Sequence, residues 1–183
     1  MPNVRHPLAD PARLSALDRT QLMDTSSDES FDRLTRMAAD LIGAPISLMT
    51  LVDEKRQFFK SAVGLTGWMA EARGSDVKYS FCQYVVTSGA TMVVENSAVH
   101  PVVKDNPGFT ELGVQAYLGV PIHSPDGYTL GSLCVADNRP RQWTQAQIRL
   151  MNELSDLVST QIKLHEEVRR RQTAELVLRQ DLT

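Results

Sequence analysis

The chain has 183 residues, 42% of them hydrophobic, and a net charge of −3 with acidic and basic residues interspersed. This length allows one domain with a sizeable core plus an extension, but it leaves little room for two full domains. Because the charges form neither a basic stripe nor an acidic block, the composition argues against nucleic-acid binding and against a disordered acidic tail.

Two helices are predicted before residue 44. The first is expected to begin at Asp10-Pro11, because proline suits the first helical turn, and to run to about Met23. The second is expected to begin near Ser26, because Ser26 and Glu29 have the spacing of a capping box. Its apolar residues recur at helical spacing until Gly43, a typical helix end: Phe31, Leu34, Ala38, Leu41 and Ile42.

The pattern then changes to that of β-strands. Residues 46–52 are apolar on both faces, as in a buried strand, and a polar turn leads into a second strand over residues 57–63. We expect these two strands to form an antiparallel hairpin. Three more strands are predicted at residues 92–95, 114–122 and 128–137, and the turn sequence Ser124-Pro-Asp-Gly127 joins the last two.

The segments between the strands are longer than simple turns. Residues 64–78 read as a loop, a short helix capped by Ser80 is expected to end at Gly89, and residues 96–113 read as irregular. Since no βαβ alternation is present, the predicted class is α+β with a central antiparallel sheet and the terminal helices on one face. The loops and the short helix would cover the other face and enclose a small-molecule pocket.

The last forty residues predict a long helix. Thr144 and Gln147 have capping-box spacing, and Trp143 and Ile148 have the spacing of a hydrophobic staple. A helix to Leu182 would be about 58 Å long, more than its own domain can cover. We interpret it as a dimeric connector; the alternative is a core helix to about Leu164 followed by a solvated tail. Its heptad-spaced seam is Leu150, Leu154, Leu157, Gln161, Leu164, Val168, Arg171, Glu175, Leu178 and Leu182.

The sequence also predicts the cellular compartment of the protein. Cys82 and Cys134 are the only cysteines, are far apart in sequence, and form no C-x-x-C pair. No apolar run reaches the roughly 18 residues of a membrane span, and no signal-peptide pattern is present. We therefore expect a soluble, cytoplasmic protein with no membrane partner.

Five motifs in order resemble those of a GAF domain. They are residues 31–45, the hairpin over 51–64, Ser80-Phe-Cys-Gln83, Gly119-Val-Pro-Ile122 and residues 125–134. The resemblance covers about residues 26–163, which leaves a helical extension at 1–25 and a helical connector at 164–183. It is closest to the GAF modules of bacterial histidine kinases, diguanylate cyclases and regulatory phosphatases.

The resemblance implies a non-enzymatic sensory module that binds a small molecule, pairs as a parallel homodimer, and signals to an output domain of one of those three types. The proposed dimer and connector residues are Leu150, Leu154, Leu157, Gln161, Leu164, Val168 and Leu178. The candidate ligand-binding residues are Phe81, Cys82, Val85, Glu95, Asn96, His100, Tyr117 and Leu133. The apolar members of that set could equally fill the core.

The family's cofactors can be tested against the sequence. Residues 104–112 lack the Cys and His of bilin-binding members, and the four histidines are scattered, which disfavours haem and metals. For a cyclic nucleotide the basic candidates are Arg73, Lys78 and Lys104, but the Asn-Lys-Phe-Asp-Glu signature is absent. The ligand therefore stays unidentified.

Cys82 supports an alternative function. A thiol just after a predicted helix cap would have a lowered pKa, which suggests a redox sensor or redox enzyme. Thiol catalysis of the methionine sulfoxide reductase type needs a resolving sulfur within reach, and Cys134 lies in an apolar strand pattern. Cys82 could instead be a small buried hydrophobe. A ligand-free dimerisation domain is the remaining alternative.

Overall fold

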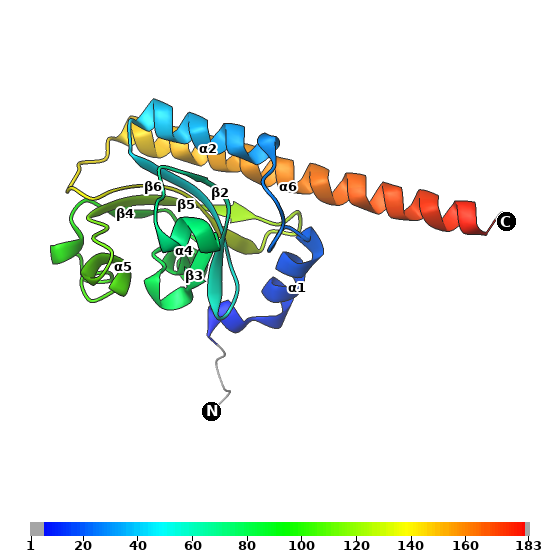
Figure 1. Cartoon of the computed structure of the whole chain (residues 1–183), viewed down its shortest axis with the longest axis horizontal. Coiled ribbons are helices and arrows are strands. Elements are labelled where there is room, and N and C mark those ends of the chain that lie inside the picture. The colour runs from blue at the N-terminus through cyan, green and yellow to red at the C-terminus, as the bar shows by residue number, and fades with distance from the viewer. Residues whose placement is uncertain (1–5, 182–183) are drawn as a thin grey trace.

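The computed structural model describes residues 6–181, and the strands of this range form one antiparallel sheet (Figure 1). The strand order is β3-β2-β1-β6-β5-β4. The strands are β1 (Ile46–Val52), β2 (Arg56–Val63), β3 (Gly74–Asp76), β4 (Met92–Val94), β5 (Ala116–His123) and β6 (Thr129–Asp137). The helices are α1 (Pro11–Thr20), α2 (Glu29–Ile42), α3 (Trp68–Ala72), α4 (Cys82–Ser88), α5 (Pro107–Thr110) and α6 (Gln145–Gln180), with 3-10 turns η1 (Pro7–Ala9), η2 (Val77–Tyr79) and η3 (Ser97–Val99). The predicted α+β class and its antiparallel sheet are confirmed.

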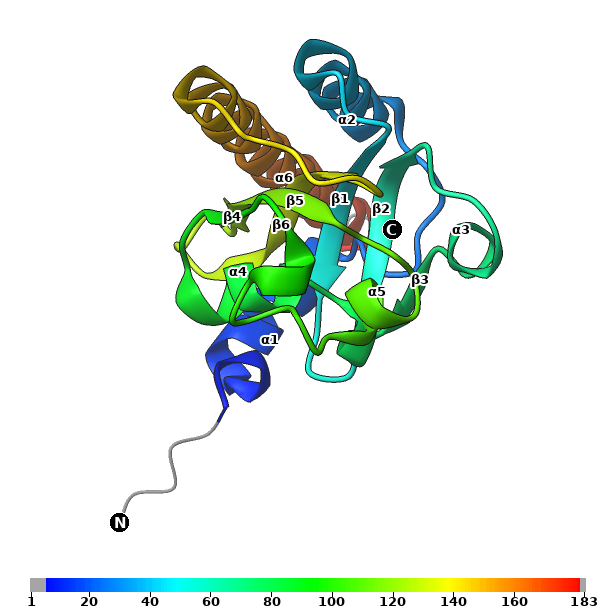
Figure 2. The same cartoon turned by 90° about the vertical axis from the view of Figure 1, so that its left-hand side faces the viewer.

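The sheet has a different cover on each face. Helices α2 and α6 lie side by side on one face, and the short helices α3, α4 and α5 lie on the other (Figures 1 and 2). Successive residues of a strand point to opposite faces. In β6, accordingly, Leu133 packs into the core beneath α2 and α6, whereas Cys134 packs into the cluster beneath α4. Each central strand therefore contacts both layers.

The edge strand β3 was not predicted, because its three residues lie within a glycine-rich segment that reads as a loop. Gly74 pairs with Phe58 of β2, and a Cβ atom at this position would lie 2.3 Å from the carbonyl oxygen of Gln57. Only glycine allows so close an approach of the two backbones. The loop prediction for residues 64–78 is therefore wrong at β3 and at α3.

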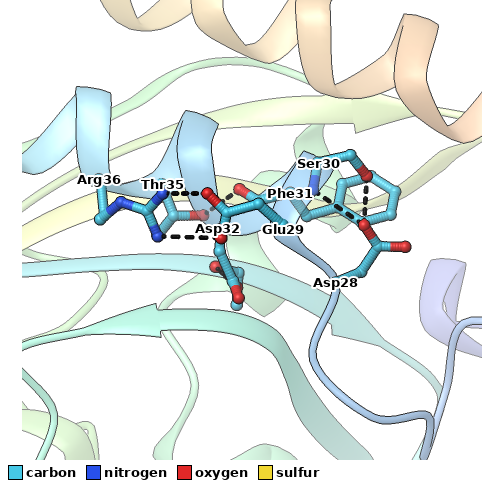
Figure 3. A network of polar contacts seen from close by, with 8 residues as sticks. Asp28, Glu29, Ser30, Phe31, Asp32, Thr35 and Arg36 are labelled. Carbon is cyan, nitrogen blue, oxygen red and sulfur yellow. Dashed lines mark hydrogen bonds and ion pairs between the residues drawn. The ribbon is translucent and has the colours of Figure 1, made fainter.

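Helix α2 begins later than predicted. Its N-cap is Asp28, whose carboxylate accepts hydrogen bonds from the backbone N–H of Ser30, at 2.9 Å, and from its hydroxyl (Figure 3). The Ser26 capping box does not form, since Asp28 is the N-cap, and the Ser26 carbonyl accepts a hydrogen bond of 2.6 Å from Lys60 Nζ on β2. Gly43, in the left-handed conformation, ends the helix as predicted.

We expect Asp28→Asn to show how much the negative charge of this N-cap contributes to the stability of the domain. Hydrogen bonding from the Ser30 hydroxyl, more than the nearby His165 and Lys60, holds the pKa of Asp28 below its ordinary value. A lowered folded-state pKa gives stability that is present above the unfolded pKa and is lost as pH falls through the folded one. Asparagine keeps the cap acceptor, so urea unfolding should show a loss of about 0.3–1 kcal/mol at neutral pH that disappears as the pH falls through the folded-state pKa of Asp28.

Asp40→Asn on the same helix is the matched control. Asp40 is exposed near the C-terminal end of α2, where a negative charge opposes the helix dipole. Its replacement should be neutral or slightly stabilising at neutral pH. An equal loss of stability in both variants would contradict the assignment to the cap.

Helix α6 begins as the sequence predicts and extends well past the sheet (Figure 1). Both capping-box bonds form: the Gln147 N–H donates to Thr144 Oγ1 at 3.1 Å, and the Thr144 N–H donates to Gln147 Oε1 at 3.0 Å. The helix is continuous over 36 residues, or about 54 Å. Residues 171–180 are all exposed, and Leu182 lies outside the described residues. None of the helices in the described range has the length and apolarity needed to cross a bilayer.

Candidate functional site

A cavity of about 240 Å³ lies on the sheet face opposite α2 and α6. Strands β1, β2, β5 and β6 form its floor, and residues 64–69, Tyr79 and residues 108–114 contribute its walls. The lining residues are Ile46, Leu48, Gln57, Phe59, Gly64, Leu65, Thr66, Trp68, Met69, Tyr79, Phe81, Cys82, Gly108, Leu112, Val114, Tyr117, Cys134 and Ala136. The segments that the sequence placed over this face do cover it.

Five of the lining residues are aromatic, and none of the lining residues is an Asp, Glu, Lys, Arg or His. Trp68, half exposed at the mouth, meets the Tyr79 ring edge-on with centroids 5.5 Å apart. Deeper in, Phe81 meets Tyr117 edge-on at 5.4 Å. Such edge-to-face pairs are favourable arrangements, so the walls of the cavity are preformed.

The two cysteines meet at the floor of the cavity. Cys82 Sγ at the start of α4 lies 3.9 Å from Cys134 Sγ on β6, although the residues are 52 positions apart in sequence. The Tyr117 hydroxyl donates to Cys82 Sγ at 3.2 Å and lies 3.2 Å from Ser132 Oγ. Nothing in the sequence indicated that Cys134 lies near Cys82; the two meet because the sheet places β6 directly beneath α4.

The surroundings of the two thiols differ. Hydrogen bonding from Cys134, with further hydrogen bonds from Tyr117, Thr50 and Ser132, lowers the pKa of the Cys82 thiol to about 7 despite its burial. The pKa of Cys134 is raised well above its ordinary value, by the hydrogen bond to Cys82 and by burial. Because the Tyr117 hydroxyl donates to Cys82, the negative charge of the pair resides on Cys82.

Three of the eight predicted ligand-binding residues line the cavity: Phe81, Cys82 and Tyr117. Val85 is buried in the core beneath α4. Leu133 lies on the opposite face of the sheet, because strand alternation allows only one of Leu133 and Cys134 to face the cavity.

The other three predicted residues lie along the segment after β4. Glu95 is exposed. The Asn96 side chain caps η3 by accepting from the Ala98 N–H at 3.1 Å. His100 Nδ1 accepts from the Val102 N–H at 3.2 Å. None of the three is among the cavity-lining residues.

Sequence reasoning missed most of the wall. Gln57 and Phe59 come from β2, a strand that mixes polar and apolar residues on both faces, so its pattern does not tell which side chains face the cavity. Trp68 and Met69 lie in a segment that was predicted to cover a surface, and two large apolar residues between glycines were the available signal.

The basic candidates for a nucleotide phosphate also lie outside the cavity lining. Arg73 Nη1 donates to the Thr25 carbonyl at 2.6 Å and so ties the segment before α2 to the sheet. Lys78 lies over the outer Tyr79 ring, 5.1 Å from its centroid. Within residues 6–181, no cluster of three or more His, Cys, Asp or Glu side chains could hold a metal ion.

The predicted connector residues divide into two groups. Leu154 is buried in the domain's own core and Leu150 packs against it, so these two belong to the folded body. Gln161 is half-buried. Leu157, Leu164, Val168 and Leu178 are exposed along α6.

One antiparallel sheet with a helical layer on one face and a covered cavity on the other is a layered α+β architecture. The GAF domain family model matches residues 26–162, so the chain belongs to the GAF domain family. It is a sensory or regulatory domain of the kind present in bacterial signalling proteins.

A cyclic di-GMP phosphodiesterase of Pseudomonas aeruginosa is 28% identical over 159 residues, which are 86% of this chain and 26% of that protein. The chain thus spans about a quarter of its curated relative. The GAF domain of an Acinetobacter phosphoenolpyruvate-protein phosphotransferase superposes with a TM-score of 0.63 at 19% identity, covering 87% of this chain and 98% of that one. A free methionine-R-sulfoxide reductase from Neisseria meningitidis gives 0.62 at 15% identity, covering 85% and 91%. These two structural likenesses concern the fold alone.

Proposed function

We propose that this GAF domain binds a small uncharged molecule in the 240 Å³ cavity and transmits its occupancy through a parallel pair of α6 helices to an output domain. The observation that carries the proposal is the position of the cavity on the same strands that support α6. Tyr117 of β5 lines the cavity, and its neighbour Leu118 packs into the core beneath α6. A ligand that displaces β5 or β6 therefore acts on the helix as well.

The lining selects the chemical class of the ligand. Burying a charge without a partner is costly; the lining offers no cation to an anionic ligand, and its one readily ionised thiol, Cys82, already accepts a hydrogen bond from Tyr117. The volume lies below the roughly 300–1,000 Å³ of most ligand sites, which favours a small molecule. A neutral aromatic compound fits this cavity better than a cyclic nucleotide, a haem or a bilin.

The exposed seam of α6 supports pairing with a second copy. Leu157, Leu164 and Val168 follow coiled-coil spacing and are each about half exposed or more. Helix α2, which packs beside α6, exposes Met37 and Leu41 as well. In a dimer these apolar surfaces would be covered. By analogy with the cyclic di-GMP phosphodiesterase relative of this chain, the output domain would be a cyclic di-GMP enzyme.

Thermal unfolding with indole as the probe tests the ligand class. If indole binds the folded chain, a concentration 100 times its Kd adds about 2.7 kcal/mol, which corresponds to a Tm rise of about 5–10 °C. Ala136→Leu, which fills part of the cavity, should abolish this rise. Ala98→Leu, on exposed η3, is the matched control and should retain it. Stabilisation by cyclic AMP but not by indole would contradict an uncharged ligand.

A further inference from the structure

We propose that Cys82 and Cys134 are a redox-active pair that forms a reversible disulfide when a hydroperoxide enters the cavity. The two sulfurs are free thiols 3.9 Å apart, and both line the cavity although almost no part of either reaches the outer surface. A small oxidant can therefore reach both of them by the ligand's route. This inference does not depend on the identity of the ligand.

The residues around the two cysteines favour this reaction. Tyr117 donates its hydroxyl to Cys82, and Gly119 provides the space for that hydroxyl, since a Cβ atom at Gly119 would lie 2.2 Å from it. Thr50 and Ser132 are opposite each other in register on β1 and β6, on the face that carries Cys134, and are fully buried. Thr50 Oγ1 has no hydrogen-bond partner while Cys82 is a neutral thiol, and it is placed to donate to Cys82 when that sulfur is a thiolate. Buried polar groups without a partner are rare enough to require a reason.

The backbone allows the two sulfurs to meet. A disulfide needs a separation of about 2.05 Å, so they must approach by about 1.9 Å. Cys134 is held in the middle of the sheet, paired with Leu48 of β1 and Gly119 of β5. Cys82 begins the seven-residue helix α4, which no strand pairing restrains. We therefore expect Cys82, rather than Cys134, to make most of this approach.

The chemistry balances with the hydroperoxide as the two-electron oxidant. The Cys82 thiolate attacks the distal oxygen of the hydroperoxide, the O–O bond breaks, and Cys82 becomes a sulfenic acid while the alkoxide leaves and takes up a proton from water to form the alcohol. The Cys134 sulfur then attacks the Cys82 sulfur, the S–S bond forms, and hydroxide leaves and takes the Cys134 proton as water. The lowered pKa of Cys82 and the raised pKa of Cys134 assign the first role to Cys82 and the second to Cys134.

The test treats the reduced full-length chain with hydrogen peroxide. Because the chain has only two cysteines, thiols titrated after denaturation should fall from two to none, with a mass loss of about 2 Da that a thiol reductant reverses. Peptide mapping should find Cys82 joined to Cys134 within one chain. Retention of both thiols, a disulfide between chains, or separate oxidation of each cysteine to sulfinic acid would overturn the proposal.

Variants separate the roles of the residues. Cys134→Ser should stop at the sulfenic acid, so that dimedone labels Cys82 far more than in the unaltered chain; equal labelling would overturn the resolving role of Cys134. Tyr117→Phe should raise the pKa of Cys82 and slow thiol loss at pH 7 by about two- to fivefold. Tyr79→Phe removes a hydroxyl from the same cavity that makes no described hydrogen bond to either sulfur, and should leave the rate unchanged. Equal rates in the two tyrosine variants would overturn the role of Tyr117.

Discussion

Replacing Leu164 and Val168 together by glutamate should convert the proposed dimer into a monomer. The two side chains are 50% and 53% exposed in the single chain and lie on the heptad seam of α6. Fully burying a Val or Leu side chain is worth about 1.5–3 kcal/mol, and each residue is present twice in a symmetric pair. Because about 2.8 kcal/mol corresponds to a hundredfold change in Kd, we expect the dimer to weaken by at least that factor. Sedimentation equilibrium over a range of concentrations measures it.

The same helix offers a matched control. Leu176 and Val177 are 61% and 51% exposed, and they fall at the outward positions directly after Glu175 of the seam. Replacing both by glutamate changes the same residue types and adds the same charge, yet the dimer should persist. If the control dissociates while the Leu164 and Val168 variant remains dimeric, the two helices do not pair through the seam that contains Leu164 and Val168. If the unaltered chain is monomeric at millimolar concentration, the connector proposal fails.

The polar seam positions bear on how such a pairing could be switched. Gln161, Arg171 and Glu175 interrupt the apolar seam, and Arg171 pairs with Glu167 within its own helix. Polar residues at seam positions set register at a cost in stability. A helix pair that is only moderately stable can be shifted by a ligand, provided the ligand binds the two arrangements with different affinity.

Features with local chemical causes could be predicted from the sequence. The capping box at Thr144, the glycine after α2 and the Ser124–Gly127 turn each depend on residues within a few positions of one another, and all three occur. The start of α2 was misplaced because Ser26 and Asp28 both suit an N-cap. Asp28 takes the cap, and Ser26 instead lies in a segment that Lys60 of β2, distant in sequence, holds through the Ser26 carbonyl.

The site depends on contacts across the sheet, which local patterns do not encode. The meeting of Cys82 with Cys134 follows from the packing of α4 over β6. The sequence alone could have shown that Leu133 and Cys134 do not both face the cavity, since consecutive residues of a strand point to opposite faces of the sheet. The choice of face still required the strand order, and that order is fixed by long-range pairing.

Replacing Arg13 by alanine should destabilise the whole domain by about 2–4 kcal/mol. The Arg13 side chain is 4% exposed, although it lies on α1, before the residues that the GAF family model matches. Its Nη1 donates to the Val52 carbonyl at 2.7 Å and, more weakly, to the Thr129 carbonyl at 3.4 Å, and its Nη2 donates to the Leu8 carbonyl at 2.9 Å. Alanine would leave buried carbonyl groups without donors at the ends of β1 and β6.

The fork of the guanidinium matters as well as its charge. Burial lowers the pKa of Arg13, and the nearby Asp53 and Asp10 oppose this effect, so the group stays charged and bonded to three segments at once. A lysine ammonium is a single point and cannot donate to both sides of this junction, so Arg13→Lys should recover only part of the loss.

Arg19→Ala is the control, because Arg19 lies on the same helix and makes an exposed ion pair with Asp126. Such surface pairs contribute about 0–1 kcal/mol, so this variant should unfold close to the unaltered chain in urea. If Arg13→Ala and Arg19→Ala lower the stability by equally small amounts, α1 contributes little to the stability of the domain. A large difference would make the N-terminal segment part of the folded unit. Ala16 and Leu17 of α1, which lie in the core together with residues of α6, already indicate that outcome.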